Sequence, residues 1–170
     1  MEAEPGQGLA PARNGMAASA VGFEFSGFRQ ISMQDIKLGW VVGIIDGEGS
    51  VTFDRHGKWR RPGLSVTSTD IDILNELKEL LGGAIIKVKE RRRKKNGDLF
   101  KSAWIWRLNG GRQVLNVLEQ IVPFMKCPKK LLRAKYLLAN YNQTTPRNGV
   151  YSSEAIVKKQ LLEEGFWLLT

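Results

Sequence analysis

The sequence predicts an α+β domain with the element order αββαββα, in which a four-stranded antiparallel sheet carries its helices on one face. Three observations support this prediction: apolar residues recur at helical spacing in some segments, they alternate with polar residues in others, and Asn96-Gly97 separates two of the alternating segments. An Asn-Gly pair in that position is the strongest short-range signal for a β-hairpin. We expect residues 1–30 to be a poorly ordered leader and residues 31–170 to form a single domain with an extra C-terminal helix.

The first half of the domain reads as a helix, two strands and a second helix. Ser32 is placed to cap the first helix, and Asp35 lies in its first turn, whereas Gly82 and Gly83 end the second helix. Between the helices, apolar residues alternate with polar ones, as expected for strands with one buried face. The expected segments are a helix at 33–47, a strand at 50–55, a basic loop at 57–63, a strand at 64–68 and a helix at 70–81.

The second half repeats the strand, strand and helix order and adds further helices. Residues 109–111 break the second hairpin strand, and apolar residues at helical spacing follow. Phe100, Trp104 and Trp106 share one face of that strand, and we expect this face to lie in the core. The expected segments are hairpin strands at 84–95 and 99–108, a helix ending near Ile121, a linker at 123–128, a helix at 129–141, a loop at 142–152 and a last helix ending near Trp167.

The composition indicates a protein that binds a polyanion. The chain of 170 residues has 26 Lys and Arg against 17 Asp and Glu, which gives a net charge of +9 and a pI near 9.8. A domain this basic usually binds nucleic acid. No apolar run is long enough to span a membrane, and residues 1–30 lack the pattern of a signal peptide. We therefore expect an intracellular protein, in the cytoplasm or nucleoid or in an organelle.

The scarcity of cysteine and histidine limits the chemistry that the chain can perform. Cys127 and His56 are the only residues of their types, which excludes an internal disulfide, a cysteine-cluster zinc site and a two-histidine metal site. A Ser-His-Asp triad has no supporting pattern. Any catalysis would therefore depend on carboxylates, lysines, a bound metal ion and water.

Residues 41–49 and the glycines around them carry most of the functional information. Gly39, Gly43 and Gly47 are four residues apart, so they lie on one face of the predicted helix. Each glycine in a helix interior costs roughly 1 kcal/mol relative to alanine, and a stripe of three is typical of a face that a second helix approaches closely. Glu48 would then lie near the end of that second helix. The alternative interpretation is an ordinary core helix followed by a turn.

Residues 41–49, Val-Val-Gly-Ile-Ile-Asp-Gly-Glu-Gly, resemble the signature of the LAGLIDADG homing endonucleases, and the resemblance extends over roughly residues 33–140. It implies the αββαββα fold of one LAGLIDADG domain. It also implies an intron-encoded endonuclease that makes a double-strand break in a long, roughly palindromic DNA duplex and produces short 3′ overhangs. Because the chain has a single copy of the motif, the resemblance implies a homodimer with Gly39, Gly43 and Gly47 at its interface. The implied cofactor is Mg²⁺ or Mn²⁺.

The resemblance also assigns catalytic residues. Glu48 matches the family's metal-binding catalytic acid, and the resemblance implies that the main-chain carbonyl of Gly47 helps to bind the metal. Glutamate in place of the frequent aspartate is longer but keeps the ligand type. Ser68 stands where the family often has glutamine, although serine has a shorter reach. Lys130 is the first choice for the family's lysine and Lys129 the second. A solvated lysine at a helix start is the alternative interpretation of both.

A basic hairpin is the second functional signal. Cations alternate from residue 87 to residue 95 and so share one face of the predicted strand, and we expect Lys101 and Arg107 to line the same face from the partner strand. Such a two-stranded ribbon fits the major groove of DNA, although a solvated edge strand kept basic against aggregation would show the same pattern. The predicted DNA-contacting residues are Thr52, Asp54, Arg61, Lys87, Lys89, Arg91, Arg93, Lys95, Lys101 and Arg107.

Two other functions are compatible with these features. A maturase of the same fold would bind intron RNA without cleaving DNA, and a basic protein without catalytic activity would only bind DNA. Glu48 and the lysine at 129 or 130 favour the nuclease, although a maturase could retain both. A divalent-metal cleavage assay on a library of duplex sites separates the three functions.

Overall fold

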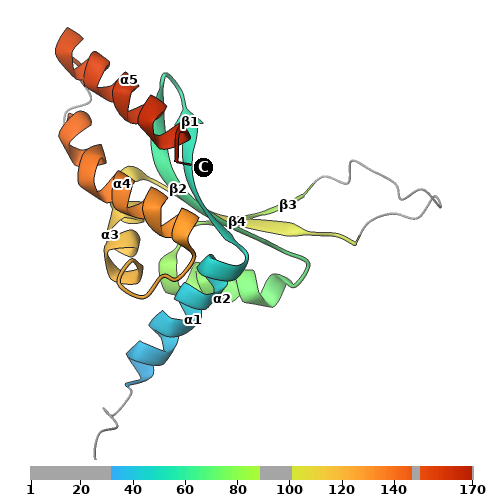
Figure 1. Cartoon of the computed structure of the whole chain (residues 1–170). Coiled ribbons are helices and arrows are strands. Elements are labelled where there is room, and N and C mark those ends of the chain that lie inside the picture. The colour runs from blue at the N-terminus through green and yellow to red at the C-terminus, as the bar shows by residue number, and fades with distance from the viewer. Residues whose placement is uncertain (1–31, 89–100, 147–149, 170) are drawn as a thin grey trace, which may run out of the picture. The chain divides into compact units, whose positions relative to one another are not determined.

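The computed structural model describes residues 32–88, 101–146 and 150–169, and it confirms the predicted α+β fold (Figure 1). The predicted leader lies outside the described residues. Within those ranges, no helix combines the length and the apolar character that crossing a membrane requires. The elements are α1 (Met33–Gly47), β1 (Gly49–His56), β2 (Trp59–Ser68), α2 (Ile71–Leu81), β3 (Ala84–Lys87), β4 (Trp104–Asn109), α3 (Gly111–Ile121), α4 (Pro128–Thr144) and α5 (Ser153–Trp167).

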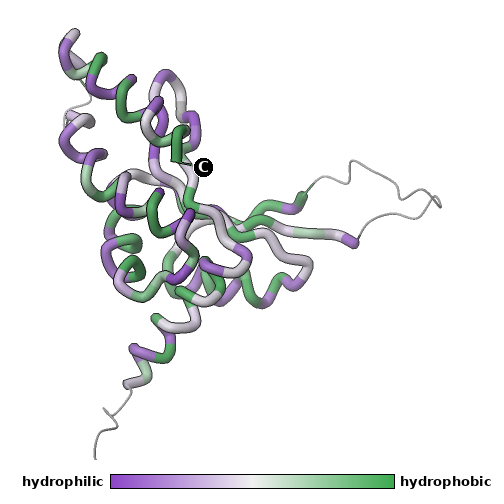
Figure 2. Tube along the Cα trace, viewed as in Figure 1, coloured by the Kyte–Doolittle hydropathy of each residue, from purple (hydrophilic) through white to green (hydrophobic). Residues whose placement is uncertain are grey.

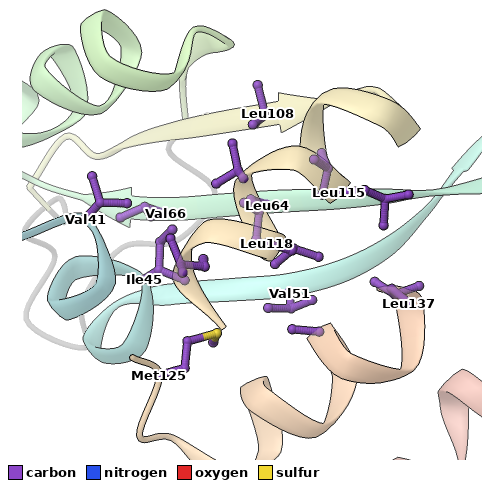
Figure 3. Close-up of a cluster of buried hydrophobic side chains, with 14 of the residues drawn as sticks. Val41, Ile45, Val51, Leu64, Val66, Leu108, Leu115, Leu118, Met125 and Leu137 are labelled. Atoms are coloured by element: carbon purple, nitrogen blue, oxygen red, sulfur yellow. The ribbon is translucent and has the colours of Figure 1, made fainter. Parts of the chain in front are cut away.

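The four strands form one antiparallel sheet in the order β1-β2-β4-β3. Strand residues that point to one face of the sheet are buried, among them Phe53, Leu64 and Trp106, because the helices cover that face. Figure 3 shows Leu64 of β2 together with Ile45 of α1 and Leu118 of α3 in this core. The opposite face of the sheet bears none of the described helices (Figure 1).

β2 is longer than the sequence predicts, since residues 59–63 belong to the strand and not to a loop. They pair with β1 along their whole length, which leaves only residues 57–58 in the turn. Pro62 has no backbone N–H, but β4 reaches β2 only as far as Gly63, so Pro62 lies where β2 has a single neighbouring strand. The prediction of a loop at 57–63 is therefore wrong.

α1 begins and ends where its sequence predicts. The Asp35 N–H donates a hydrogen bond to the Ser32 hydroxyl at 3.1 Å, and the Ser32 N–H donates to the Asp35 carboxylate at 3.1 Å, so the two residues form a capping box. Such a cap stabilises a helix by roughly 1 kcal/mol. β1 begins at Gly49, directly after Glu48, and only glycine fits there because an added Cβ would lie 2.7 Å from the backbone of Ile45.

β3 and β4 form the base of the predicted hairpin. They pair antiparallel, and the Val88 N–H continues the ladder by donating to the Ala103 carbonyl at 2.8 Å. The predicted turn at 96–97 lies outside the described residues. Trp106 is fully buried, and its indole N–H donates to the Gly82 carbonyl at 2.8 Å, so its predicted place in the core is confirmed.

α5 packs against α4 and is attached to the hairpin of β1 and β2. Hydrophobic and hydrophilic residues alternate along this helix (Figure 2), and its Leu162 and Phe166 are buried. The rings of Phe166 and Phe53 are in contact, with centroids 5.3 Å apart. The Glu163 carboxylate accepts a hydrogen bond from the Arg60 N–H at 3.1 Å and forms an ion pair with the Arg60 side chain at 3.5 Å. α5 therefore holds the beginning of β2.

α5 also buries a lysine. Lys159 is fully buried; its ammonium group donates a hydrogen bond to the Thr145 hydroxyl at 3.0 Å and lies 4.1 Å from the centre of the Tyr141 ring. Burial lowers the pKa of Lys159 from 10.5 to about 8, while the charge of Glu163 raises this pKa and the charge of Arg61 lowers it. The contact with the ring favours the ammonium form, but desolvation outweighs it.

We expect Lys159→Met to raise the free energy of unfolding by about 1–3 kcal/mol at pH 7, because an apolar chain of similar length replaces a buried ammonium group. The pKa of Lys159 is about 8 in the folded state against 10.5 as the ordinary value, so the unfolded chain binds more protons between these pH values. Wild-type stability therefore rises from pH 8 towards pH 10, and the difference between the two proteins shrinks.

Chemical denaturation at pH 7 and at pH 10 measures both effects. The exposed Lys158, which pairs with Glu154 at 2.6 Å, gives the matched control Lys158→Met. This control should change stability by less than about 0.5 kcal/mol. A Lys159→Met protein that is less stable than the wild type at pH 7 would contradict the prediction.

Candidate functional site

The Glu48 carboxylate lies at the junction between α1 and β1. Glu48 is the C-cap residue of α1 and is exposed, and its carboxylate forms no hydrogen bond or ion pair with another described residue. The last turn of α1 contains no basic residue. Because the C-terminus of a helix carries partial negative charge, the carboxylate and the helix end together favour a cation at this corner.

Asp46, the other acid of the motif, takes part in the fold. Its Oδ2 atom accepts hydrogen bonds from the Lys126 N–H at 2.5 Å and the Cys127 N–H at 3.3 Å, which fixes the chain just before α4. Its Oδ1 atom is buried and has no partner among the described residues. A buried carboxylate oxygen without a donor is costly, so Oδ1 marks a position where a further donor would be stabilising.

Lys130 connects the start of α4 to the end of α1. Its ammonium group donates hydrogen bonds to three carbonyls, those of Ile45 at 3.1 Å, Asp46 at 2.6 Å and Gly47 at 3.2 Å. The last carbonyls of a helix have no donors within the helix, and a cation there also offsets the helix dipole. The structure thus places Lys130 against the residue that precedes Glu48.

The other two predicted catalytic residues are placed differently. Lys129 is exposed, and its side chain forms no hydrogen bond or ion pair with a described residue. The Ser68 hydroxyl accepts a hydrogen bond from the Asp70 N–H at 3.0 Å, so it stabilises the turn between β2 and α2. Within the described ranges, Lys130 is the one of the three that is bonded to the end of α1. The catalytic role of each stays a prediction.

The surroundings of Glu48 fit a cation that keeps water and phosphate ligands. In the part of the chain that the structure describes, no three His, Cys, Asp or Glu side chains are grouped so that they could hold a metal ion. Glu48 supplies one carboxylate without a protein partner among these residues. The Gly47 carbonyl precedes it in the chain and accepts a hydrogen bond from Lys130 at 3.2 Å, which leaves one lone pair of this oxygen for a further ligand. Mg²⁺ is usually bound through one or two carboxylates, with waters and phosphate oxygens as its other ligands. The donor set of one chain suits that kind of site.

We call the sheet face opposite the helices the open face. The register places Thr52 and Asp54 of β1, Arg61 of β2 and Arg107 of β4 on it. The Thr52 hydroxyl donates to Asp54 Oδ2 at 2.9 Å, and Arg61 lies directly opposite Asp54. A groove of about 350 Å³ is lined by Asp54, Arg61, Arg107 and Asn109. The predicted DNA-contacting residues of these three strands therefore gather on one surface.

The cations of the hairpin do not all lie on the open face. Lys87 pairs with Trp104, and Trp104 lies on the same face of β4 as the buried Trp106, which is the face that the helices cover. Arg107 pairs with Ala84 and lies on the open face. The prediction that Lys87 and Arg107 share a face is therefore wrong, because β3 and β4 pair odd-numbered with even-numbered residues and side chains reverse face with every residue. Lys101 is exposed just before β4, and Lys89, Arg91, Arg93 and Lys95 lie outside the described residues.

The register adds open-face residues that the sequence analysis did not select. Ser65 lies between Ser50 of β1 and Arg107 of β4, and Thr67 follows it on the same face. Thr67 is exposed near the end of β2. The alternation of both residues with the buried Val66 is the sequence signal that would have identified them.

Three glycines leave one side of α1 bare. A Cβ atom added at Gly39, Gly43 or Gly47 would meet no atom within 4 Å, so none of the described residues packs against this stripe. A groove of about 320 Å³ runs beside it and is lined in part by Gly39, Gly43, Asp46 and Phe124. Phe124, which the sequence analysis did not select, is 53% exposed. The stripe and the groove can accept a second helix.

Comparisons with known proteins agree with this geometry. A family model described as a LAGLIDADG-like domain matches residues 35–122. The fold is similar to that of the homing endonuclease I-CvuI in complex with a DNA target in the presence of Mg, with a TM-score of 0.57 and 21% identity over 79% of this chain and 82% of that chain. It is also similar to the archaeal intron-encoded homing endonuclease I-Vdi141I complexed with DNA, with a TM-score of 0.54 and 18% identity over 81% of this chain and 86% of that chain. A search of curated protein sequences finds no significant match.

Proposed function

Because this chain belongs to the LAGLIDADG family, we propose that it is a site-specific homing endonuclease that makes a metal-dependent double-strand break in duplex DNA. One observation carries the proposal: Glu48 is an exposed carboxylate without a protein partner, at the end of a helix with a bare glycine stripe. I-CvuI and I-Vdi141I each form a complex with DNA, which supports duplex DNA as the ligand of this chain. I-Vdi141I is intron-encoded, which supports the proposal that this chain is intron-encoded as well.

Glu48 and the carbonyl of Gly47 would hold Mg²⁺ or Mn²⁺ together with phosphate oxygens and water. When bound, the ion would activate a water molecule and stabilise the charge on the departing oxygen. Lys130 has a positioning role in this proposal, because its bonds to three carbonyls fix the end of α1 and with it the backbone of Glu48.

We propose that two chains form a homodimer through α1. One chain offers a single Glu48 carboxylate and a single open face, whereas cutting both strands of a duplex requires two of each. The bare stripe allows close approach of a second α1, and the exposed ring of Phe124 adds apolar surface beside it. A two-fold axis of this kind matches a pseudo-palindromic target.

The open face is proposed to contact the major groove. Arg61 and Arg107 can bind phosphates or guanine edges, and the hydroxyls of Thr52 and Ser65 can bond to bases or to the backbone. Asp54 is the one acid among these residues, and a carboxylate in the groove suits the amino group of cytosine. The open face therefore offers groups that recognise bases in addition to groups that bind any phosphate.

A cleavage assay with Mg²⁺ on a library of random duplexes tests the proposed function. We expect cutting of both strands at a site with approximate two-fold symmetry, and loss of cutting when the metal is chelated. Binding of structured RNA without DNA cleavage would favour the maturase. A protein that binds neither nucleic acid would overturn the proposal.

We expect Lys130→Met and Lys129→Met to differ strongly, although both remove one charge from adjacent positions. Lys130→Met removes the donor to three carbonyls, so the free energy of unfolding should fall by about 2 kcal/mol and cleavage should slow by roughly 10- to 100-fold because the Glu48 backbone loses its support. Lys129→Met should change both quantities little, since its side chain has no described partner.

Chemical denaturation and single-turnover cleavage of the duplex measure these two quantities. Lys130→Arg keeps the charge and part of the bonding, and it should recover part of the lost activity. If Lys129→Met is the more damaging of the two substitutions, the assignment of the lysine has to be exchanged.

A further inference from the structure

A cavity of about 620 Å³ lies between the beginning of β2, the N-terminus of α3 and the C-terminal end of α4. Its lining includes three arginines, Arg60, Arg61 and Arg112. Trp59 and Tyr151 line another part of it, with ring centroids 4.6 Å apart and ring planes 30° apart. The cavity thus combines cationic groups with aromatic surface, and none of its lining residues belongs to the Glu48 end of the molecule.

Most of the positive charge of this cavity is not neutralised within the described chain. Arg60 is paired with Glu163, whereas Arg61 and Arg112 form no ion pair among the described residues. Arg112 lies in the first turn of α3, which contains no acidic residue, and the N-cap residue Gly110 provides no side-chain hydrogen bond. The partial positive charge of this helix N-terminus therefore adds to that of the arginines.

A further cation lies behind the lining. The buried ammonium group of Lys159 donates to the Thr145 hydroxyl at 3.0 Å and lies 4.1 Å from the centre of the Tyr141 ring, and both of these residues line the cavity. The charge of Arg61 is one of the causes that lower the pKa of Lys159, so the cations around the cavity repel one another. An anion in the cavity would offset this repulsion.

We propose that the cavity binds a backbone phosphate of the DNA duplex, outside the part of the target that the open face contacts; the inference rests on the proposed function. Arg61 lines both this cavity and the groove of the open face, so the two adjoin at this arginine. Guanidinium groups and helix N-termini are common ligands of phosphate oxygens. Trp59 and Tyr151 offer apolar surface to the neighbouring deoxyribose.

The position of the cavity along the sheet sets the distance of this phosphate from the cleavage site. Trp59 follows the turn at the end of β1 that is remote from Glu48 (Figure 1). β1 has 8 residues, and such a strand spans roughly 26 Å. Where the strand follows the duplex, this span corresponds to roughly eight base pairs at about 3.4 Å each. The contact is therefore expected near the outer end of each half-site.

The test compares Arg112→Gln with the wild type on two duplexes that share a centre. The long duplex extends about twelve base pairs to each side of the centre, and the trimmed duplex about six, so that it ends before the cavity. On the long duplex we expect Arg112→Gln to bind about three- to tenfold more weakly and to reduce the slope of log Kd against log salt by roughly 0.9 for each lost contact. On the trimmed duplex its binding should equal that of the wild type.

Two variants serve as controls. Lys78→Gln removes the same charge from the exposed surface of α2 and should bind both duplexes like the wild type. Arg107→Gln removes an open-face cation and should weaken binding to both duplexes. Arg112 is exposed, so its substitution leaves the core intact, and thermal unfolding verifies this.

The outcomes separate this inference from the proposed function. Wild-type affinity of Arg112→Gln for both duplexes, beside a clear loss for Arg107→Gln, would overturn only the phosphate site. Equal weakening on both duplexes would place Arg112 within the footprint of the open face and would also overturn it. Weakened binding of structured RNA alone would assign a different ligand. A wild type that binds no duplex would remove the proposed function together with the inference.

Discussion

Glu48→Gln is expected to abolish strand cleavage, while duplex DNA is bound as tightly as by the wild type or more tightly. The neutral amide is a poor ligand for Mg²⁺, and a metal site of this kind contributes several kcal/mol to transition-state stabilisation. A loss of that size slows the reaction by at least about a hundredfold. Binding should not suffer, because the substitution removes one negative charge from each chain and lessens the repulsion of phosphates. The carboxylate has no described partner, so stability should remain unchanged.

Single-turnover cleavage with Mg²⁺ and equilibrium binding with Ca²⁺ measure the two effects separately. Glu79→Gln removes the same charge from the exposed surface of α2 and serves as the matched control. Asp46→Asn should behave differently from both, because the Asp46 carboxylate holds the chain before α4, and its loss should lower stability as well as activity. Cleavage by Glu48→Gln within about tenfold of the wild-type rate would falsify the catalytic assignment.

The elements that the sequence predicts well are those with local signals. Ser32 and Asp35 form the expected capping box, and the break at 82–83 ends α2 as predicted. The two predictions about strands that the structure contradicts concern residues 57–63 and the face of Lys87, and they depended on signals that are not local. The start of β2 at Trp59 and the face of Lys87 depend on which residue of the neighbouring strand lies opposite, and pairing between strands is not encoded by a short segment.

Some features of the candidate site can likewise be recognised from a short segment of sequence, whereas others depend on contacts between distant residues. Glu48 and the glycine stripe can be recognised within nine consecutive residues and their immediate surroundings, and the structure leaves both exposed. The bonds of Lys130 to α1 join residues 83 to 85 positions apart in the chain, and the bond of Arg60 to Glu163 joins residues 103 positions apart. Such contacts depend on tertiary packing, so the sequence could select Lys130 only through a family resemblance and gave no indication of Glu163.

Gly43→Leu is expected to convert the protein into a monomer, or into a loosened dimer, with cleavage lost. Gly43 lies at the middle of the bare stripe, and the described part of the chain has space for a side chain there because none of its atoms lies within 4 Å of an added Cβ. Leucine also has the higher helix propensity, by roughly 0.5–1 kcal/mol, so the fold of one chain should be as stable as before. An isobutyl group between two helices that meet at a glycine stripe would hold them several ångströms apart, which separates the two Glu48 carboxylates.

Sedimentation of the free protein and of its complex with duplex DNA provides the measurement. Gly43→Ala should give an intermediate loss, because it adds only a methyl group. Gln160→Leu introduces the same side chain on the exposed surface of α5 and should leave the dimer and its activity intact. A wild type that sediments as a monomer both alone and on DNA would refute the two-fold arrangement. If Gly43→Leu instead remains dimeric and fully active, the interface must lie on another surface.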